Sequence, residues 1–162
     1  MRVYVINLDD YGEGDATGEW FRLPVDEEDI KERLGIKGKQ KGYTIRDYVL
    51  PFRISMSDHI EKVNEMYRLV SELDGFPIQN ELKDIMWKWK LSLRTIVDCK
   101  NDIKHYACSD FDELAYKLIE DNYFGELPES LMAFIDYDKL ALVFERDERF
   151  LLTSHGIFMR AM

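Results

Sequence analysis

The sequence predicts an α+β fold arranged as three small units. Three patterns predict it: short β-branched runs around one capped helix over residues 1–56, apolar residues at helical spacing over 57–100, and alternating short strands and helices over 101–162. With 162 residues, of which 46% are hydrophobic, the chain can bury cores of this size. We therefore expect an α/β N-terminal unit, a helical middle unit and an α/β C-terminal unit.

Three short strands are predicted in the first unit. Each is a brief run rich in β-branched and aromatic residues, bounded by Gly, Pro or Asp. They lie at residues 2–8, 19–23 and 43–49. An acidic loop with glycines follows the first strand, and a loop rich in glycine and lysine, residues 34–42, precedes the third.

A helix is predicted between the second and third strands. Asp26 can cap its start and Gly35 can end it. Acidic residues fill the first turn and basic residues the last, which is the order that the helix dipole favours. Val25 and Ile30 have the spacing of a hydrophobic staple around this start.

Two amphipathic helices are predicted in the middle unit. The first begins near Ser57 and ends before Gly75, and the second covers residues 80–97. Their apolar stripes are Ile60, Val63, Tyr67, Val70 and Leu73 in the first, and Leu82, Ile85, Met86, Trp89, Leu93, Ile96 and Val97 in the second.

The last unit returns to mixed structure. A strand is expected within residues 102–108, followed by a helix that Ser109 or Asp110 caps, with Asp112 or Glu113 completing a capping box. Two further helices are expected: Pro128 fits the first turn of one, and Asp138 fits the start of the other. Residues 150–153 and 157–160 are expected to pair as strands around Ser154-His155-Gly156.

Charge excludes several functions. The formal net charge is −10, and it is uneven: nine acids and two bases in residues 1–30 give −7, while residues 31–60 carry +4 and residues 101–162 again −7. Nucleic acids and anionic lipids attract clustered Lys and Arg, so direct binding to either is not expected. We find neither a signal peptide nor a long apolar segment, and only two cysteines, which predicts a cytoplasmic protein.

Enzyme and metal-site patterns are weak. The histidines His59, His105 and His155 lie in no catalytic motif, and Cys99, His105 and Cys108 lack a clear fourth ligand for zinc. The acidic residues 9–15 miss the alternation of a calcium loop, and residues 34–42 are not a phosphate-binding loop. We predict no enzyme, cofactor or metal; a small metal-dependent enzyme using residues 9–15 or the carboxylates of Asp136 and Asp138 is the least favoured alternative.

Four segments resemble the ArdA antirestriction family, in the right order and over nearly the whole chain. They are VYVINLDDYGEGDATGEWFRLP near the start, DYVLPF at residues 47–52, ELPESLMAFIDYDKLA at 126–141 and TSHGIF at 153–158. The third falls where that family carries its antirestriction motif. The resemblance adds to the charge pattern, which by itself indicates only a soluble surface.

The resemblance implies both a function and an architecture. Proteins of this family are acidic, elongated DNA mimics carried on mobile genetic elements. They form homodimers and occupy the DNA-binding groove of type I restriction-modification enzymes, contacting the methyltransferase core, so that incoming DNA escapes restriction. The family also has three small units in a row. An alternative is an acidic interaction module, or a mimic directed at another DNA-binding protein.

Acidic residues at the two ends of the chain are the candidates for the DNA-mimic surface. Residues 110–138 hold nine carboxylates and one base, and helical neighbours ~5–6 Å apart can imitate the spacing of phosphates. The candidates are Asp9, Asp10, Glu13, Asp15, Glu19, Glu27, Glu28, Glu120, Asp121, Glu126, Glu129, Asp136 and Asp138.

The resemblance also places the dimer interface in the last unit. Its candidate residues are Phe111, Ala115, Tyr116 and Phe124, which would form a self-complementary apolar patch. The basic residues 31–53 depart from the expected acidic surface. Either these bases face inward or away from the partner, or the mimicry is confined to patches.

Overall fold

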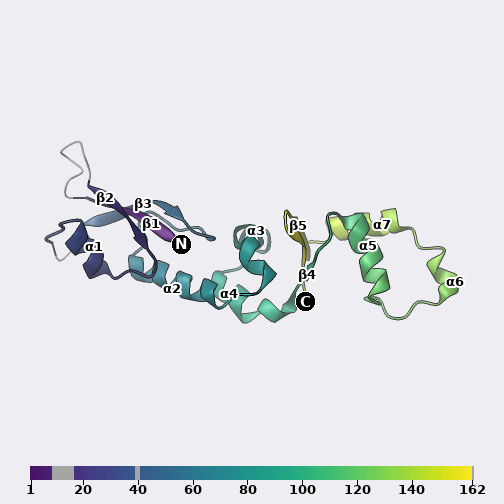
Figure 1. Cartoon of the computed structure of the whole chain (residues 1–162). Helices are drawn as coiled ribbons and strands as arrows, with labels where there is room; N and C mark the ends of the chain where they lie inside the picture. The colour runs from purple at the N-terminus through teal and green to yellow at the C-terminus, as the bar shows by residue number, and fades with distance from the viewer. Residues whose placement is uncertain (9–16, 39–40, 162) are drawn as a thin grey trace. The chain divides into compact units, whose positions relative to one another are not determined.

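The structure is a computed structural model that describes residues 1–8, 17–38 and 41–161 (Figure 1). It contains helices and two small antiparallel sheets, which confirms the predicted α+β class. The chain divides into two compact units, Met1–Asp74 and Gly75–Met162, and each is described by itself. The boundary falls between the two helices predicted for a middle unit, and the three-unit division stays a prediction.

The first unit contains a three-stranded antiparallel sheet in the order β2-β1-β3. Its strands are β1 (Arg2–Asn7), β2 (Gly18–Arg22) and β3 (Tyr43–Val49). Alternation along the strands buries Val3, Val5 and Phe21 on one face, whereas Tyr4 and Trp20 lie opposite each other on the other face.

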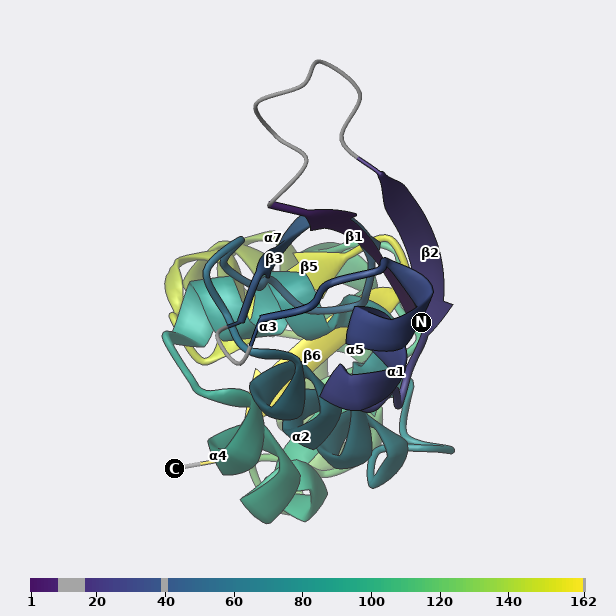
Figure 2. The ribbon, with the colours of Figure 1, turned by 90° about the vertical axis from the view of Figure 1, so that its left-hand side faces the viewer.

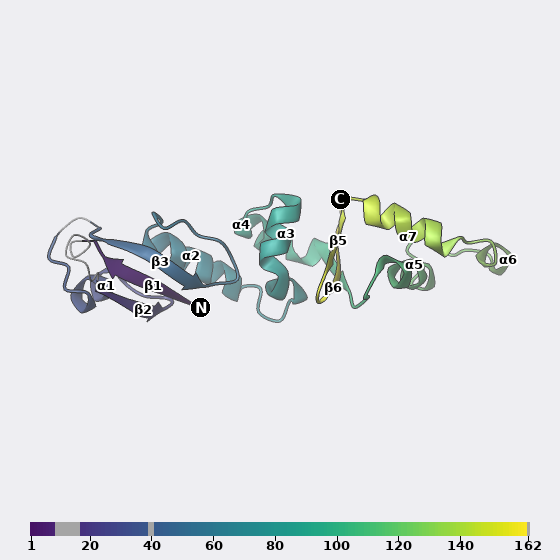
Figure 3. The same ribbon diagram turned by 90° about the horizontal axis from the view of Figure 1, so that it is seen from above.

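Two helices cover the buried face of this sheet (Figures 2 and 3). They are α1 (Glu27–Arg33) and α2 (Ile60–Ser71). Ile30 of α1 and Ile60 and Val63 of α2 are fully buried, as their helical spacing predicts. Asp26 is the N-cap residue of α1, but its side chain makes no capping hydrogen bond.

In the second unit, the single helix predicted over residues 80–97 is wrong. The chain forms η2 (Pro77–Glu81), α3 (Leu82–Trp89), α4 (Leu93–Asp98) and η3 (Lys100–Asp102). The break occurs at Lys90, which adopts a left-handed conformation with φ 51°. Ser92 then caps α4 by accepting a hydrogen bond from the Thr95 backbone N–H over 3.1 Å, so the local cap overrides the continuous apolar stripe.

The rest of this unit combines a second sheet with three helices. The strands are β4 (Ile103–Tyr106), β5 (Phe150–Thr153) and β6 (Gly156–Arg160) in the order β4-β6-β5, and the predicted hairpin at residues 150–160 is confirmed. The helices are α5 (Phe111–Glu120), α6 (Glu129–Met132) and α7 (Tyr137–Arg146). Leu114 and Leu118 of α5, Phe144 of α7 and Ile157 of β6 share one core.

Local capping sets where these helices begin. Asp110 caps α5 by accepting from the backbone N–H of Glu113 over 2.8 Å, which confirms one of the two predicted cap residues. The Glu113 carboxylate accepts in return from the Ser109 N–H over 2.7 Å, one residue before the N–H that a capping box uses. The prediction that Asp138 starts α7 is wrong. Asp136, two residues before Asp138, is the cap residue of α7, and its side chain accepts from the Lys139 N–H over 3.1 Å. Pro128 is the N-cap residue of α6 and precedes its first turn.

No helix in the described part of the chain is long and apolar enough to cross a membrane.

Candidate carboxylate-rich binding surfaces

The first unit has a depression of about 570 Å³ that is lined almost entirely by carboxylates. We call it the α1 surface. Its lining residues are Asp26, Glu27, Glu28, Asp29, Glu32 and Glu61, with Lys31 as the one base among them. Two of the predicted residues, Glu27 and Glu28, are here. Glu61 belongs to α2, and no local signal in the sequence places it beside α1.

Basic residues neutralise part of this surface. Lys31 Nζ lies 2.6 Å from a Glu27 carboxylate oxygen, and this hydrogen bond lowers the pKa of Glu27. Arg33 pairs with the predicted Glu19 through two hydrogen bonds and lies 3.6 Å from Asp29. Two of the predicted carboxylates are thus already compensated.

Three basic side chains of the segment 31–53 contact groups of their own unit. Lys31 and Arg33 face the acids of their own unit. Lys41 Nζ donates to the backbone carbonyl oxygens of Ser57 and Asp58 over 3.0 and 2.8 Å, which ties the chain before β3 to the start of α2. These three bases therefore serve the first unit internally.

Glu27, His59 and Glu61 form the one group of side chains in the described residues that could hold a metal ion. Their ligand atoms lie within 4.8 Å of one another. Glu27 is already bound to Lys31, and Glu61 and His59 are exposed. The suspected zinc residues Cys99, His105 and Cys108 do not form such a group. Cys108 is buried, and burial raises the pKa of its thiol.

The second unit has a groove of about 490 Å³ between the start of α5 and one face of α7. We call it the α5–α7 groove. Four carboxylates line it, together with apolar side chains and no base. The carboxylates are Asp110, Asp112, Asp138 and Glu145.

The helices explain how these carboxylates converge. Asp138, Leu142 and Glu145 follow the i, i+4, i+7 spacing of one helical face, and α5 packs against α7. The α5 dipole stabilises Asp110 and Asp112 at its N-terminus. No base in the described part of the chain pairs with Asp112, Asp138 or Glu145. The groove therefore offers uncompensated negative charge.

The groove differs from the predicted set of acidic residues. It contains the predicted Asp138 but adds Asp110, Asp112 and Glu145. Glu145 follows Asp138 at the i+7 position, on the same face of α7, so helical periodicity predicts that the two lie side by side. Asp112 carries no such signal, because its place beside α7 depends on how two helices pack.

The other predicted carboxylates of this unit lie elsewhere on it. Asp121 pairs with Lys117 over 3.2 Å, and Asp136 pairs with Lys139 over 2.7 Å while capping α7. The Lys139 hydrogen bond lowers the pKa of Asp136. Glu120, Glu126 and Glu129 are exposed and have no cationic partner among the residues described. Asp9, Asp10, Glu13 and Asp15 lie outside the described residues.

The predicted dimer residues have mixed environments. Ala115 is 0% exposed and belongs to the core of its own unit, so its side chain cannot touch a second copy in this conformation. Phe111 also packs against that core. Tyr116 and Phe124 are exposed, although Tyr116 stacks on Tyr137 with ring centroids 4.0 Å apart.

More exposed apolar side chains lie in and after α6. Phe134 is 82% exposed and Leu131 52%, and Val143 on α7 is 60% exposed. In Figure 1 the segment that contains α6 loops away from α5 and α7. The sequence does not mark Phe134 as a candidate for the dimer interface, because a large apolar residue is more often buried in a core.

The turn in the TSHGIF segment is anchored on a buried carboxylate. Glu81 is 7% exposed and accepts hydrogen bonds from Ser154 Oγ over 3.0 Å and from His155 Nδ1. Burial acts to raise the pKa of Glu81, but the hydrogen bonds from His155 and Ser154 bring it below its usual value. Ser154 and His155 share this one carboxylate, so they fasten the β5–β6 hairpin to η2.

The family model described as Antirestriction protein (ArdA) matches residues 3–159. A search of curated protein sequences finds no significant match.

Proposed function

Because the chain belongs to the ArdA antirestriction protein family, we propose that it protects mobile DNA by presenting carboxylates to the DNA-binding groove of a type I restriction-modification enzyme. Membership implies antirestriction activity and an interaction with restriction-modification enzymes. The family is one of inhibitors rather than of enzymes. The mode of inhibition, the class of target and the residues that act are parts of the proposal.

The α5–α7 groove carries the proposal. A protein that grips DNA uses Lys and Arg to contact phosphates, which follow one another about every 3.4 Å along a strand. Asp112, Asp138 and Glu145 offer charge without a compensating base, on two helices held by a common core. Rigid carboxylates lose little conformational freedom on binding, so they can compete with phosphates.

The α1 surface supports the same proposal with a second patch. Its six lining carboxylates face one lysine. Because phosphate contacts position a protein on DNA and base contacts specify the sequence, an inhibitor that imitates phosphates does not need to imitate a target sequence. One inhibitor can thus act on enzymes with different recognition sites, in the cytoplasm where such enzymes cut incoming DNA.

We further propose that the protein acts as a homodimer through the second unit. Phe134, Leu131 and Val143 expose large apolar side chains, together with the predicted Phe124 and Tyr116. A two-fold contact uses the same patch on both copies and needs an apolar centre. Burying these side chains against their equivalents would remove them from water.

Neutralising the groove tests the proposed mode of inhibition. The triple variant Asp112→Asn, Asp138→Asn, Glu145→Gln keeps side-chain shape and removes three charges. In competition with duplex DNA for a type I methyltransferase core, the half-inhibitory concentration should rise roughly tenfold or more at low salt, since each close charge contact to a desolvated base contributes on the order of 1 kcal/mol.

A matched control separates the groove from total charge. Asp84→Asn, Asp98→Asn and Glu148→Gln make the same change of net charge at exposed positions outside both surfaces. This control should inhibit nearly as well as the unaltered protein. Equal loss in both triple variants would mean that only net charge matters, and full inhibition by the groove variant would refute the assignment of the groove.

A further inference from the structure

Among the residues that the structure describes, none pairs with the outer edge of β2. In the order β2-β1-β3, β2 has a neighbour on one side only, and Figure 3 shows it at the border of the sheet. The ladder with β1 is framed by hydrogen bonds from Asn7 N–H to the Thr17 carbonyl oxygen over 2.9 Å and from Leu23 N–H to the Met1 carbonyl oxygen over 3.3 Å.

This frame fixes which backbone groups face outward. In an antiparallel pair, alternate residues exchange ladder bonds, so Glu19 and Phe21 point their N–H and C=O groups at β1. Trp20 and Arg22 point theirs away from the sheet. These outward groups make no backbone hydrogen bond to any residue that the structure describes. Such a row of free donors and acceptors is a template for another strand.

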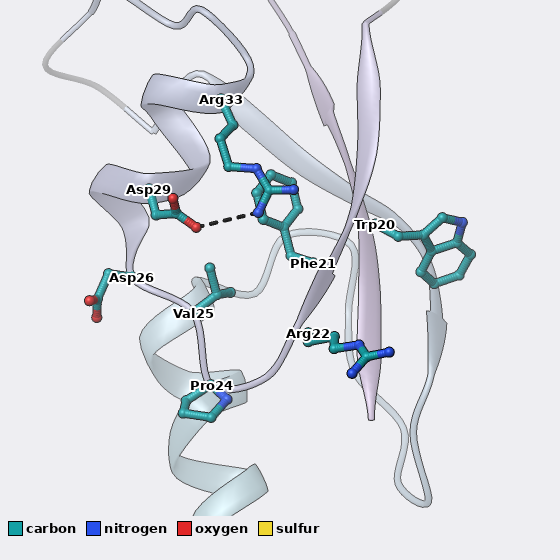
Figure 4. Close-up of a pocket in the computed structure, with 8 residues that line it drawn as sticks. All are labelled: Trp20, Phe21, Arg22, Pro24, Val25, Asp26, Asp29 and Arg33. Atoms are coloured by element: carbon teal, nitrogen blue, oxygen red, sulfur yellow. Dashed lines mark ion pairs between the residues drawn. The ribbon is translucent and has the colours of Figure 1, made fainter.

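A cavity of about 660 Å³ adjoins this edge, which leaves room for an added chain (Figure 4). Residues of β2 and of the turn that follows form one wall, and α1 forms the other. Asp26, Asp29 and Arg33 are the charged residues that the turn and α1 contribute. In Figure 4, Phe21 and Arg33 lie on the α1 side of the strand, whereas Trp20 and Arg22 lie on the opposite side.

The two sides of the edge differ in charge. On the α1 side, Arg33 is compensated by Glu19 and Asp29, and Asp26 has no cationic partner within the described part of the chain. The α1 side of the strand thus has three carboxylates, of Glu19, Asp26 and Asp29, and one guanidinium, while Arg22 lines the cavity from the other side. On the other side, the Arg2 guanidinium lies over the Trp20 ring, 4.6 Å from the ring centroid. Arg22 is the residue opposite Arg2 in the β1–β2 ladder, so this side carries two positive charges.

We propose that the edge of β2 binds an extended basic segment of a partner protein as a fourth strand. The backbone of the segment pairs with the outward groups of Trp20 and Arg22. Its alternate side chains that face α1 are Lys or Arg, which meet Asp26 and Asp29. The intervening side chains are uncharged and lie along Trp20. The proposal is independent of whether the protein inhibits a type I enzyme.

Amide hydrogen exchange with a model peptide tests the pairing. The probe is a nine-residue peptide of alternating lysine and threonine with blocked ends, and its control has glutamate at each lysine position. With saturating lysine peptide, exchange at the Trp20 and Arg22 amides should slow at least tenfold, while that of Phe21, already bonded to β1, should not change. The glutamate peptide should bind at least tenfold more weakly.

Two outcomes would overturn the proposal. One is unchanged exchange at Trp20 and Arg22 with millimolar lysine peptide. The other is protection of these amides that rises with protein concentration when no peptide is present, which would make a second copy of the chain the occupant.

A pair of variants at one position isolates the backbone contribution. Arg22→Ala keeps the outward N–H, and Arg22→Pro removes it at an edge position where proline is tolerated. Both lose the same guanidinium. The proline variant should bind the lysine peptide at least fivefold more weakly than the alanine variant, with folding of both confirmed by their amide spectra. Equal affinity would show that the backbone of β2 does not pair.

Discussion

Asn64 of α2 forms two hydrogen bonds with the backbone of Val25. Its side-chain oxygen accepts from the Val25 N–H over 3.1 Å, and its side-chain nitrogen donates to the Val25 carbonyl oxygen over 2.8 Å. The side chain is buried, at 7% exposure. Since Val25 immediately precedes the cap residue of α1, this contact holds the start of α1 beside α2. It thereby brings the first-turn carboxylates of α1 to Glu61.

Replacing Asn64 with Ala should destabilise the first unit. Both backbone groups of Val25 would lose their partners in a buried place, at about 2–4 kcal/mol in total. Amide exchange of Val5 and Ile45, which are buried in the sheet, measures the stability of this unit. Arg68→Ala on the exposed face of the same helix should change it by no more than about 0.5 kcal/mol. A similar small effect for Asn64→Ala would contradict the anchoring role.

Removing the bases that neutralise the α1 surface should strengthen inhibition. Lys31→Gln with Arg33→Gln frees Glu27 and Asp29 of this surface and the neighbouring Glu19. The half-inhibitory concentration against a type I enzyme should then fall by about threefold to tenfold at low salt. The gain should shrink as salt rises, because exposed charges are screened. The control is Lys83→Gln with Lys88→Gln on α3, which changes net charge equally. If both pairs act alike, local neutralisation is not the cause.

Tyr43 should make the first unit less stable at high pH. The side chain is 1% exposed, and burial raises its pKa to about 12. The folded state therefore keeps a proton that the unfolded state, with a pKa near 10, has released. Stability is present below pH 10 and is lost as pH rises toward 12, by about 2–3 kcal/mol.

The Tyr43→Phe variant isolates this effect. The phenolic oxygen of Tyr43 accepts from the Ile60 N–H over 3.4 Å, so the variant should lose about 1 kcal/mol at neutral pH. Between pH 10 and 12 its stability should fall less than that of the unaltered protein, as measured by denaturant unfolding at each pH. Tyr116→Phe, at an exposed position, should leave the pH profile unchanged. Parallel profiles for the Tyr43→Phe variant and the unaltered protein would disprove the assignment.

Exposed apolar residues of the second unit should control self-association. Sedimentation at micromolar concentration should find a dimer of the unaltered protein and a monomer of Phe134→Ser with Val143→Ser. Met56→Ser, which removes an exposed apolar side chain of the first unit, should leave the dimer intact. A protein that is monomeric throughout this concentration range would refute the proposed dimer.

Local signals in the sequence predicted most elements and several ends. The β5–β6 hairpin and the Asp110 cap of α5 follow from residues a few positions apart. The same local logic explains the errors. Ser92 can cap a helix, but the apolar stripe across it suggested one continuous helix; Asp136 and Asp138 are both competent caps, and their spacing alone does not choose between them.

The acidic surfaces were predictable only in part. Glu27 and Glu28 share the first turn of one predicted helix, so their grouping needed no tertiary information. Glu61 reaches them from another helix, and Asp112 reaches Glu145 from another helix as well. Neither pair has a fixed sequence spacing. The ion pair between Glu19 of β2 and Arg33 of α1 likewise could not be predicted from the sequence.

The amino-acid sequence by itself determined most of the secondary structure, the acidic ends and the likeness to the antirestriction family. These depend on short-range periodicity, capping and composition, which act within a few residues. Only the tertiary structure decided which carboxylates are free and which are paired, because packing brings helices together without regard to sequence distance. Charge that looked uniform along residues 110–138 therefore resolves into caps, ion pairs and one groove without a base.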